Sequence, residues 1–273
     1  MQIKKIFASS KFHFKFYVAG ITTTLILLPL WNPTFLKVLV SSSALILLPD
    51  SEAHSKEISE ISSIAKNITV KIEGATSGSG VLVKETHNRY TVITAWHVIK
   101  DISEKEELAI FTFDGKEYLW DSKSRRKINN LDLGIIEFES KNSYKLAVIG
   151  DSNIISEGEK VFVAGYPLRN KNNKGRFFRF KSGELESNIN LFIEDGYQLL
   201  YSNKTLKGMS GGPLLNQKGN LIGIHGKTDI DQELTSDFGK VISNGTNKAI
   251  PISYYKRFNY LNKRNSKSNQ KRI

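Results

Sequence analysis

From about Ser62 onwards, short apolar segments recur between turns rich in Gly, Asn, Asp and Lys. Several of them alternate apolar and polar residues, as strands with one buried face do. This spacing predicts an all-β fold, either a barrel or a sandwich. Helical patterns occur only at Ser55–Ala65 and at Ser253–Leu261. The predicted strands include Ile68–Ile72, Gly80–Lys84, Tyr90–Thr94, Leu108–Phe113, Leu133–Phe138, Lys160–Ala164, Leu221–Ile224 and Ala249–Ile252.

The absence of cysteine limits the chemistry available to the chain. Without cysteine there is no disulfide, no thiol nucleophile and no thiolate metal site. The five histidines are scattered and lack the spacings of a zinc site. We therefore expect neither a metal nor a cofactor. The 273 residues are 40% hydrophobic, which is enough to bury the core of one or two domains.

The net charge of +12 is concentrated at the two ends of the chain. The first 49 residues contain five Lys and no acid, and Lys263 to Arg272 contribute five more basic residues. Basic ends around a near-balanced middle are typical of targeting and surface adhesion, more than of a groove for phosphates. The charge pattern therefore predicts no nucleic-acid partner.

Two apolar runs, Phe16–Trp31 and Val38–Leu48, precede the β-rich region. Each is shorter than the roughly 18–20 residues that comfortably span a bilayer. The second follows Lys37 and leads to Ser51-Glu52-Ala53, which is the layout of a signal peptide. The alternative is a buried core helix. We expect an export signal or membrane anchor over residues 1–53, a folded domain over 54–262 and a basic tail over 263–273. That domain would then lie outside the cytoplasm, whether periplasmic, secreted or membrane-anchored.

The segment Gly208-Met209-Ser210-Gly211-Gly212-Pro213 carries the strongest chemical signal. Glycines on both sides of a serine allow positive φ angles and the close approach of a substrate carbonyl. The amide groups of Gly208 and Ser210 could then stabilise a developing oxyanion. The alternative is an ordinary Gly-rich hairpin.

A serine hydroxyl is a weak nucleophile unless a base removes its proton, so a histidine is needed. His97 directly follows the strongly apolar segment Tyr90–Trp96, and Asp132 directly precedes the apolar run Leu133–Ile136. A buried carboxylate requires a donor, and the Nδ1–H group of His97 is the natural candidate. The alternatives are a hydrogen-bonded core histidine and an aspartate in a turn.

Four motifs in this order resemble those of the chymotrypsin-like serine peptidases, from about Ser77 to Ile252. They are Ser77-Gly78-Ser79-Gly80-Val81, Thr94-Ala95-Trp96-His97, Asp132-Leu133-Gly134-Ile135 and Gly208 to Pro213. The order His, Asp, Ser is the order in that family. Because it lacks cysteine, the chain is similar to the bacterial, disulfide-free branch of that family, which includes glutamyl endopeptidases and HtrA-like peptidases.

The resemblance implies two six-stranded antiparallel β-barrels with a short C-terminal helix. It implies a serine endopeptidase acting on polypeptides, in which Ser210 is the nucleophile, His97 the general base and Asp132 the residue that orients it. Two rival functions stay open on the same fold. One is a catalytically inactive, protease-like binding module, and the other is an esterase or other acyl hydrolase.

The resemblance also predicts substrate specificity. Glutamyl endopeptidases carry a histidine at the position of His225 and a hydroxyl residue five positions before the nucleophile, here Thr205. Both can donate to a carboxylate, so we expect a preference for Glu, and also Asp, on the acyl side of the cut bond. Lys204 stands where enzymes that select Lys or Arg place an aspartate. The alternative is a small or apolar pocket, and Asp229 and Asp231 could compete for His225.

Overall fold

The computed structural model describes residues 56–103, 105–169, 175–189, 194–228 and 246–270, with side chains as far as residue 264 in the last range. The export segment predicted over residues 1–53 lies outside these ranges, and so do Asp229, Asp231 and residues 271–273 of the tail. Of the helices in the described ranges, none is long and apolar enough to cross a membrane.

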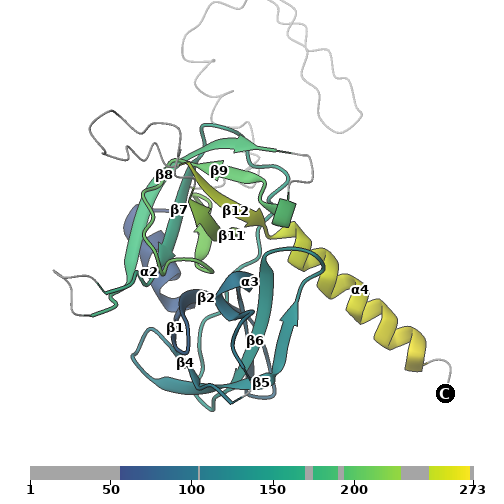
Figure 1. Ribbon diagram of the computed structural model, residues 1–273. Helices are drawn as coiled ribbons and strands as arrows, with labels where there is room; N and C mark the ends of the chain where they lie inside the picture. Colours follow the sequence, from purple (N-terminus) through teal and green to yellow (C-terminus); the bar gives the residue numbers. More distant parts are fainter. Residues whose placement is uncertain (1–55, 104, 170–174, 190–193, 229–245, 271–273) are drawn as a thin grey trace, which may run out of the picture. The chain divides into compact units, whose positions relative to one another are not determined.

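The strands form two closed antiparallel barrels of six strands each, drawn from blue to teal and from green to olive-yellow in Figure 1. The first barrel has the order β1-β2-β3-β6-β5-β4 and the second the order β10-β11-β12-β9-β8-β7. This confirms the predicted fold class. The first barrel consists of β1 (Thr69–Gly74), β2 (Ser77–Thr86), β3 (Arg89–Ala95), β4 (Leu108–Phe111), β5 (Glu117–Lys127) and β6 (Leu133–Glu139). The second consists of β7 (Lys160–Gly165), β8 (Arg179–Asn188), β9 (Leu199–Tyr201), β10 (Pro213–Leu215), β11 (Leu221–Thr228) and β12 (Asn247–Pro251).

The two predicted helices are present with different bounds. Helix α2 spans Ile58–Ile68 and buries Ile61, Ala65 and Ile68, which lie on one face because they are three or four residues apart. Helix α4 spans Ser253–Gln270 and so continues past Leu261 into the basic tail. No Pro or Gly interrupts that polar stretch, so nothing in the backbone ends the helix there.

Two short helices lie next to the pocket described below. Helix α3 (Trp96–Ile99) follows β3 directly, and the 3₁₀ turn η1 (Glu194–Gly196) precedes β9.

A large hydrophobic cluster joins the barrels to the helices. It takes Val81, Ile93 and Leu133 from the first barrel, and among others Phe162 and Ile224 from the second. Ile61 of α2 and Tyr255 of α4 belong to the same cluster. Each barrel also has its own core. The surface between the barrels is therefore a packed interior, which fixes loops of one barrel against loops of the other.

Candidate active site

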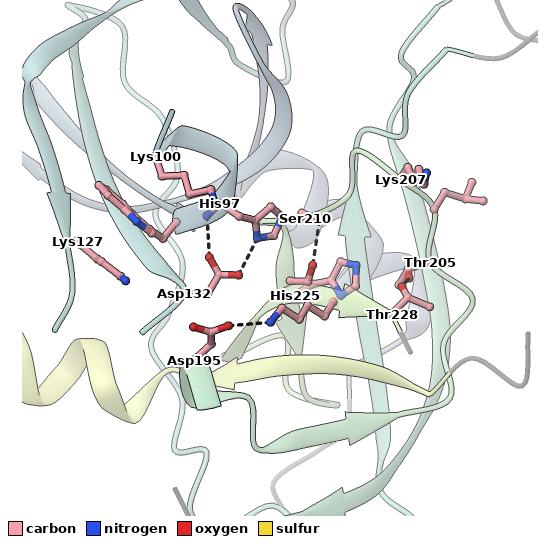
Figure 2. A pocket seen from close by; sticks show the side chains of 14 residues that line it. His97, Lys100, Lys127, Asp132, Asp195, Thr205, Lys207, Ser210, His225 and Thr228 are labelled. Carbon is pink, nitrogen blue, oxygen red and sulfur yellow. Dashed lines mark hydrogen bonds and ion pairs between the residues drawn. The ribbon is translucent and has the colours of Figure 1, made fainter. Parts of the chain in front are cut away.

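One pocket of about 840 Å³ is lined by His97, Asp132 and Ser210, together with Thr205 and His225 (Figure 2). In the first barrel, His97 lies in α3 just after β3, and Asp132 directly precedes β6, whereas the others come from the second barrel. The structure therefore brings together the five side chains that the sequence singled out, although His97 and Ser210 are 113 positions apart in the chain.

Two hydrogen bonds tie His97 to Asp132. The backbone amide of His97 donates to Oδ1 of Asp132 at 2.7 Å, and Nδ1 of His97 lies 2.7 Å from Oδ2. The amide of Trp96 also donates to the carbonyl of Asp132, at 3.1 Å. These contacts set both the position and the ring orientation of His97, whose side chain is 38% exposed.

Asp132 has a third donor that the sequence did not reveal. The hydroxyl of the buried Tyr197, just after η1, donates to Oδ2 of Asp132. Burial by itself raises the pKa of Asp132, but the hydrogen bonds from His97 and Tyr197 outweigh it and hold the pKa below its ordinary value. Burial, and then the charge of Asp132, raise the pKa of Tyr197, so its hydroxyl remains a donor. Asp132 is thus a buried, ionised carboxylate with both oxygens hydrogen-bonded.

Ser210 lies in a loop that requires glycine. Gly208 and Gly211 have φ angles of +93° and +88°, which other residues rarely adopt. The hydroxyl of Ser210 donates to the carbonyl of Gly226 at 3.1 Å. Over the described ranges, no hydrogen bond joins it to His97. Serine side chains change rotamer within nanoseconds, and catalytic hydrogen bonds often tighten only when substrate binds.

The amide groups of Gly208 and Ser210 donate to no protein acceptor in the described part of the chain, whereas the amide of Met209 donates to the carbonyl of Leu206 at 3.1 Å. These two free N–H groups, one on each side of Met209, are suited to binding a negatively charged oxygen. The loop therefore has the donors that the sequence analysis expected there.

His225, on β11, is fully buried and lines the same pocket. Burial lowers its pKa to about 4, although a hydrogen bond with the backbone of Lys248 partly raises it. Its Nδ1 atom lies 2.6 Å from the hydroxyl of Tyr201. Burial raises the pKa of that hydroxyl, so its proton stays in place and needs an acceptor. With its lowered pKa the ring is neutral, so it has one N–H donor and one acceptor nitrogen.

Thr205 lies beside a second hydroxyl, that of Thr228. The two hydroxyl oxygens are 2.9 Å apart, and both contact Oδ1 of the buried Asn247. Thr228 was not predicted from the sequence, because His225 and Thr228 should face opposite sides of a regular strand. A β-bulge at Gly226 changes this, since His225 pairs with Ala249 but Lys227 pairs with the adjacent Lys248. Both side chains therefore reach the pocket.

The comparisons with known proteins agree with this geometry. The family described as trypsin-like peptidase domain matches residues 78–224. The chain belongs to this family of trypsin-like peptidases. It is 28% identical to serine protease Do-like HtrA of Bacillus subtilis (strain 168) over 55% of this chain and 33% of that protein. It is 27% identical to exfoliative toxin A of Staphylococcus aureus over 66% of this chain and 68% of the toxin.

A third relative is serine protease HtrA-like of Staphylococcus aureus (strain USA300), which is 30% identical over 54% of this chain and 19% of that protein. The chain thus spans about a third of the length of the Bacillus subtilis relative and less of this one. The similarity to these two proteins concerns one segment of each.

Proposed function

We propose that this protein is a serine endopeptidase in which Ser210, His97 and Asp132 act as nucleophile, general base and orienting carboxylate. The observation that carries the proposal is the pair of hydrogen bonds from His97 to Asp132 in the pocket that Ser210 also lines. A histidine held in this way presents its other nitrogen, Nε2, as the base for a serine. Membership of the trypsin-like peptidase family supports the same assignment.

The reaction follows from these positions. The hydroxyl of Ser210 turns from Gly226 towards His97, gives up its proton to Nε2 and attacks the scissile carbonyl. Asp132 stabilises the imidazolium that forms, because it is ionised and buried. The amides of Gly208 and Ser210 bind the oxyanion. His97 then protonates the leaving amine, and water repeats the sequence on the acyl-enzyme.

We further propose that the enzyme prefers Glu on the acyl side of the cut bond. The neutral ring of His225 has one N–H donor, and Lys207 and Lys227 also line the pocket. The carboxylates that line the pocket have partners: Asp132 binds His97, and Asp195 lies 2.7 Å from Lys227. A basic side chain would therefore find no unpaired carboxylate among the described lining residues. An acidic side chain would find donors.

Replacement of His225 tests this specificity. In the wild type, Glu should rank above Leu, Lys and Arg in a peptide library at pH 7–8. A hydrogen bond to a charged group is worth about 1.5–3 kcal/mol, so His225→Ala should lower the ratio of kcat/KM for Glu over Leu by roughly 10- to 100-fold. Labelling of Ser210 by a fluorophosphonate should persist.

His87→Ala is the matched control, because His87 lies in the turn between β2 and β3 and does not line this pocket. A thermal unfolding curve for each variant separates specificity from stability. A wild-type library in which Leu, Lys or Arg outranks Glu would refute the acidic preference and leave the peptidase assignment untouched.

We also propose that residues 1–53 direct export and that the peptidase domain, over 54–262, works outside the cytoplasm. The two apolar runs and the absence of acidic residues before Asp50 support this. Fractionation should find the mature protein outside the cytoplasm, and N-terminal sequencing should show whether the bond between Ala53 and His54 is cut. Full-length protein found free in the cytosol would contradict the proposal.

A further inference from the structure

We infer that Ser79, on β2 of the first barrel, is a positioning residue that keeps the oxyanion-binding loop of the second barrel in its active shape. The inference rests on the proposed function, since it concerns the amides of Gly208 and Ser210. It starts from the hydrogen bonds that hold this loop.

Each carbonyl group from Lys207 to Ser210 accepts a hydrogen bond. The carbonyl of Lys207 accepts from the amide of Leu168 at 2.8 Å, and that of Met209 accepts from the amide of Gly212 at 2.9 Å. Ser79 supplies the other two. Its hydroxyl donates to the carbonyl of Gly208 at 2.9 Å, and its amide donates to the carbonyl of Ser210 at 2.8 Å.

These contacts matter because peptide units are planar, so a fixed carbonyl fixes the plane to which it belongs. Gly208 lies between two such planes and, as a glycine with a φ of +93°, has the freest backbone of the loop. The amide of Leu168 holds the plane before it, and the hydroxyl of Ser79 holds the plane after it. Without this second contact, the chain can rotate at Gly208, which displaces Met209 and with it the amide of Ser210 that should face the oxyanion.

The hydroxyl of Ser79 has little freedom to do anything else. It is fully buried and accepts a hydrogen bond from the amide of Tyr166 at 2.8 Å, so its proton is directed to the carbonyl of Gly208. The hydroxyl of Thr94 donates to the carbonyl of Ser79 at 2.7 Å and holds its backbone. Ser79 thus joins both barrels at the nucleophile loop.

Arg176 also stabilises this contact between the two barrels. Its buried guanidinium donates through Nη2 to the carbonyls of Gly78 and Tyr166, at 2.8 Å and 2.6 Å, and lies 3.4 Å from the carbonyl of Gly208. Gly78 precedes Ser79 in the chain, and Tyr166 is the residue whose amide binds the Ser79 hydroxyl. Arg176 therefore holds the two chain segments that meet at Ser79.

Ser79→Ala tests the inference, because it removes the hydroxyl and keeps the amide that binds Ser210. Loss of a whole oxyanion donor lowers kcat by about 10²–10³-fold, so a misaligned donor should lower kcat by roughly 10- to 100-fold. KM should stay within about threefold. The inhibition constant of a peptide aldehyde, whose adduct carries the oxyanion, should rise in step with the loss of kcat. The pH midpoint of kcat/KM should not move, since Ser79 contacts neither His97 nor Asp132.

Ser124→Ala is the matched control. Ser124 is also buried, accepts from the amide of Glu137 and donates to the carbonyl of Asp121, but it does not contact the nucleophile loop. If Ser79→Ala does not fold, Ser79→Cys keeps a weaker donor in a slightly larger side chain and should give an intermediate kcat.

A folded Ser79 variant with kcat within twofold of the control, or with its loss mainly in KM, overturns the inference. Its failure is distinguishable from failure of the proposed function. If Ser210→Ala abolishes activity and Ser79→Ala does not reduce it, only the role of Ser79 is wrong. If Ser210→Ala remains active, the proposed reaction itself is wrong.

Discussion

Ser210→Ala is expected to lower kcat by roughly 10⁶-fold, because it removes the atom that forms the acyl-enzyme. His97→Ala should cause a similar loss. The double variant should be no slower than either single variant, since the two residues act as one unit. Labelling by a fluorophosphonate should disappear in Ser210→Ala. The same result distinguishes a peptidase from an inactive binding module, which would not be labelled at Ser210 in the wild type.

Ser210→Ala should lower the stability of the folded state only slightly. Ser210 is half-buried, and its hydroxyl makes a neutral hydrogen bond to the carbonyl of Gly226, which is worth about 1 kcal/mol. The thermal unfolding temperature should therefore move by only a few degrees. Ser202→Ala is a matched control, because that hydroxyl also contacts a backbone carbonyl, of Glu184, but does not line the pocket. Ser210→Ala with more than a few per cent of wild-type activity would reject the assignment.

Asp132→Asn should lower kcat by roughly 10⁴-fold while preserving the shape of the side chain. The carboxylate accepts from the amide and from Nδ1 of His97, and also from Tyr197. An amide in its place has one acceptor oxygen and one donor group, so one of these donors would face an N–H group. Where that donor is Nδ1, His97 adopts the tautomer that carries its proton on Nε2, and it cannot act as the base for Ser210.

Tyr197→Phe is the informative comparison for this variant. It removes the other donor to Oδ2 and leaves His97 bound to Asp132, so we expect a loss of kcat below about tenfold. Single-turnover kinetics with a chromogenic peptide measure both losses, and thermal unfolding checks that each variant folds. If Asp132→Asn kept more than a tenth of wild-type kcat, the orienting role would belong to another residue.

The sequence identified the elements whose signal is local. Strands buried on both faces, such as β3 and β6, are continuous apolar runs and were predicted. Strands β5 and β8 were missed because each buries only one of its residues, so neither shows an apolar run. They are strands because β4 and β6, and β7 and β9, supply their backbone partners. Such pairing depends on residues far away in the chain.

The residues of the candidate site also form two groups, those that the sequence predicted and those that it did not. Some residues lie in short motifs whose residue types indicate a chemistry, so the sequence alone singled them out. They are His97, Asp132, Ser210 and Gly208. Tyr197 and Tyr201 lie in none of these motifs, and Ser79 lies in one that assigned it no role. Their roles arise from contacts with residues 65, 24 and 129 positions away. Local pattern thus determined the class of fold and indicated the groups that we propose react. Barrel closure decided which buried hydroxyls direct those groups, because a hydrogen bond depends on distance in space and not on separation along the chain.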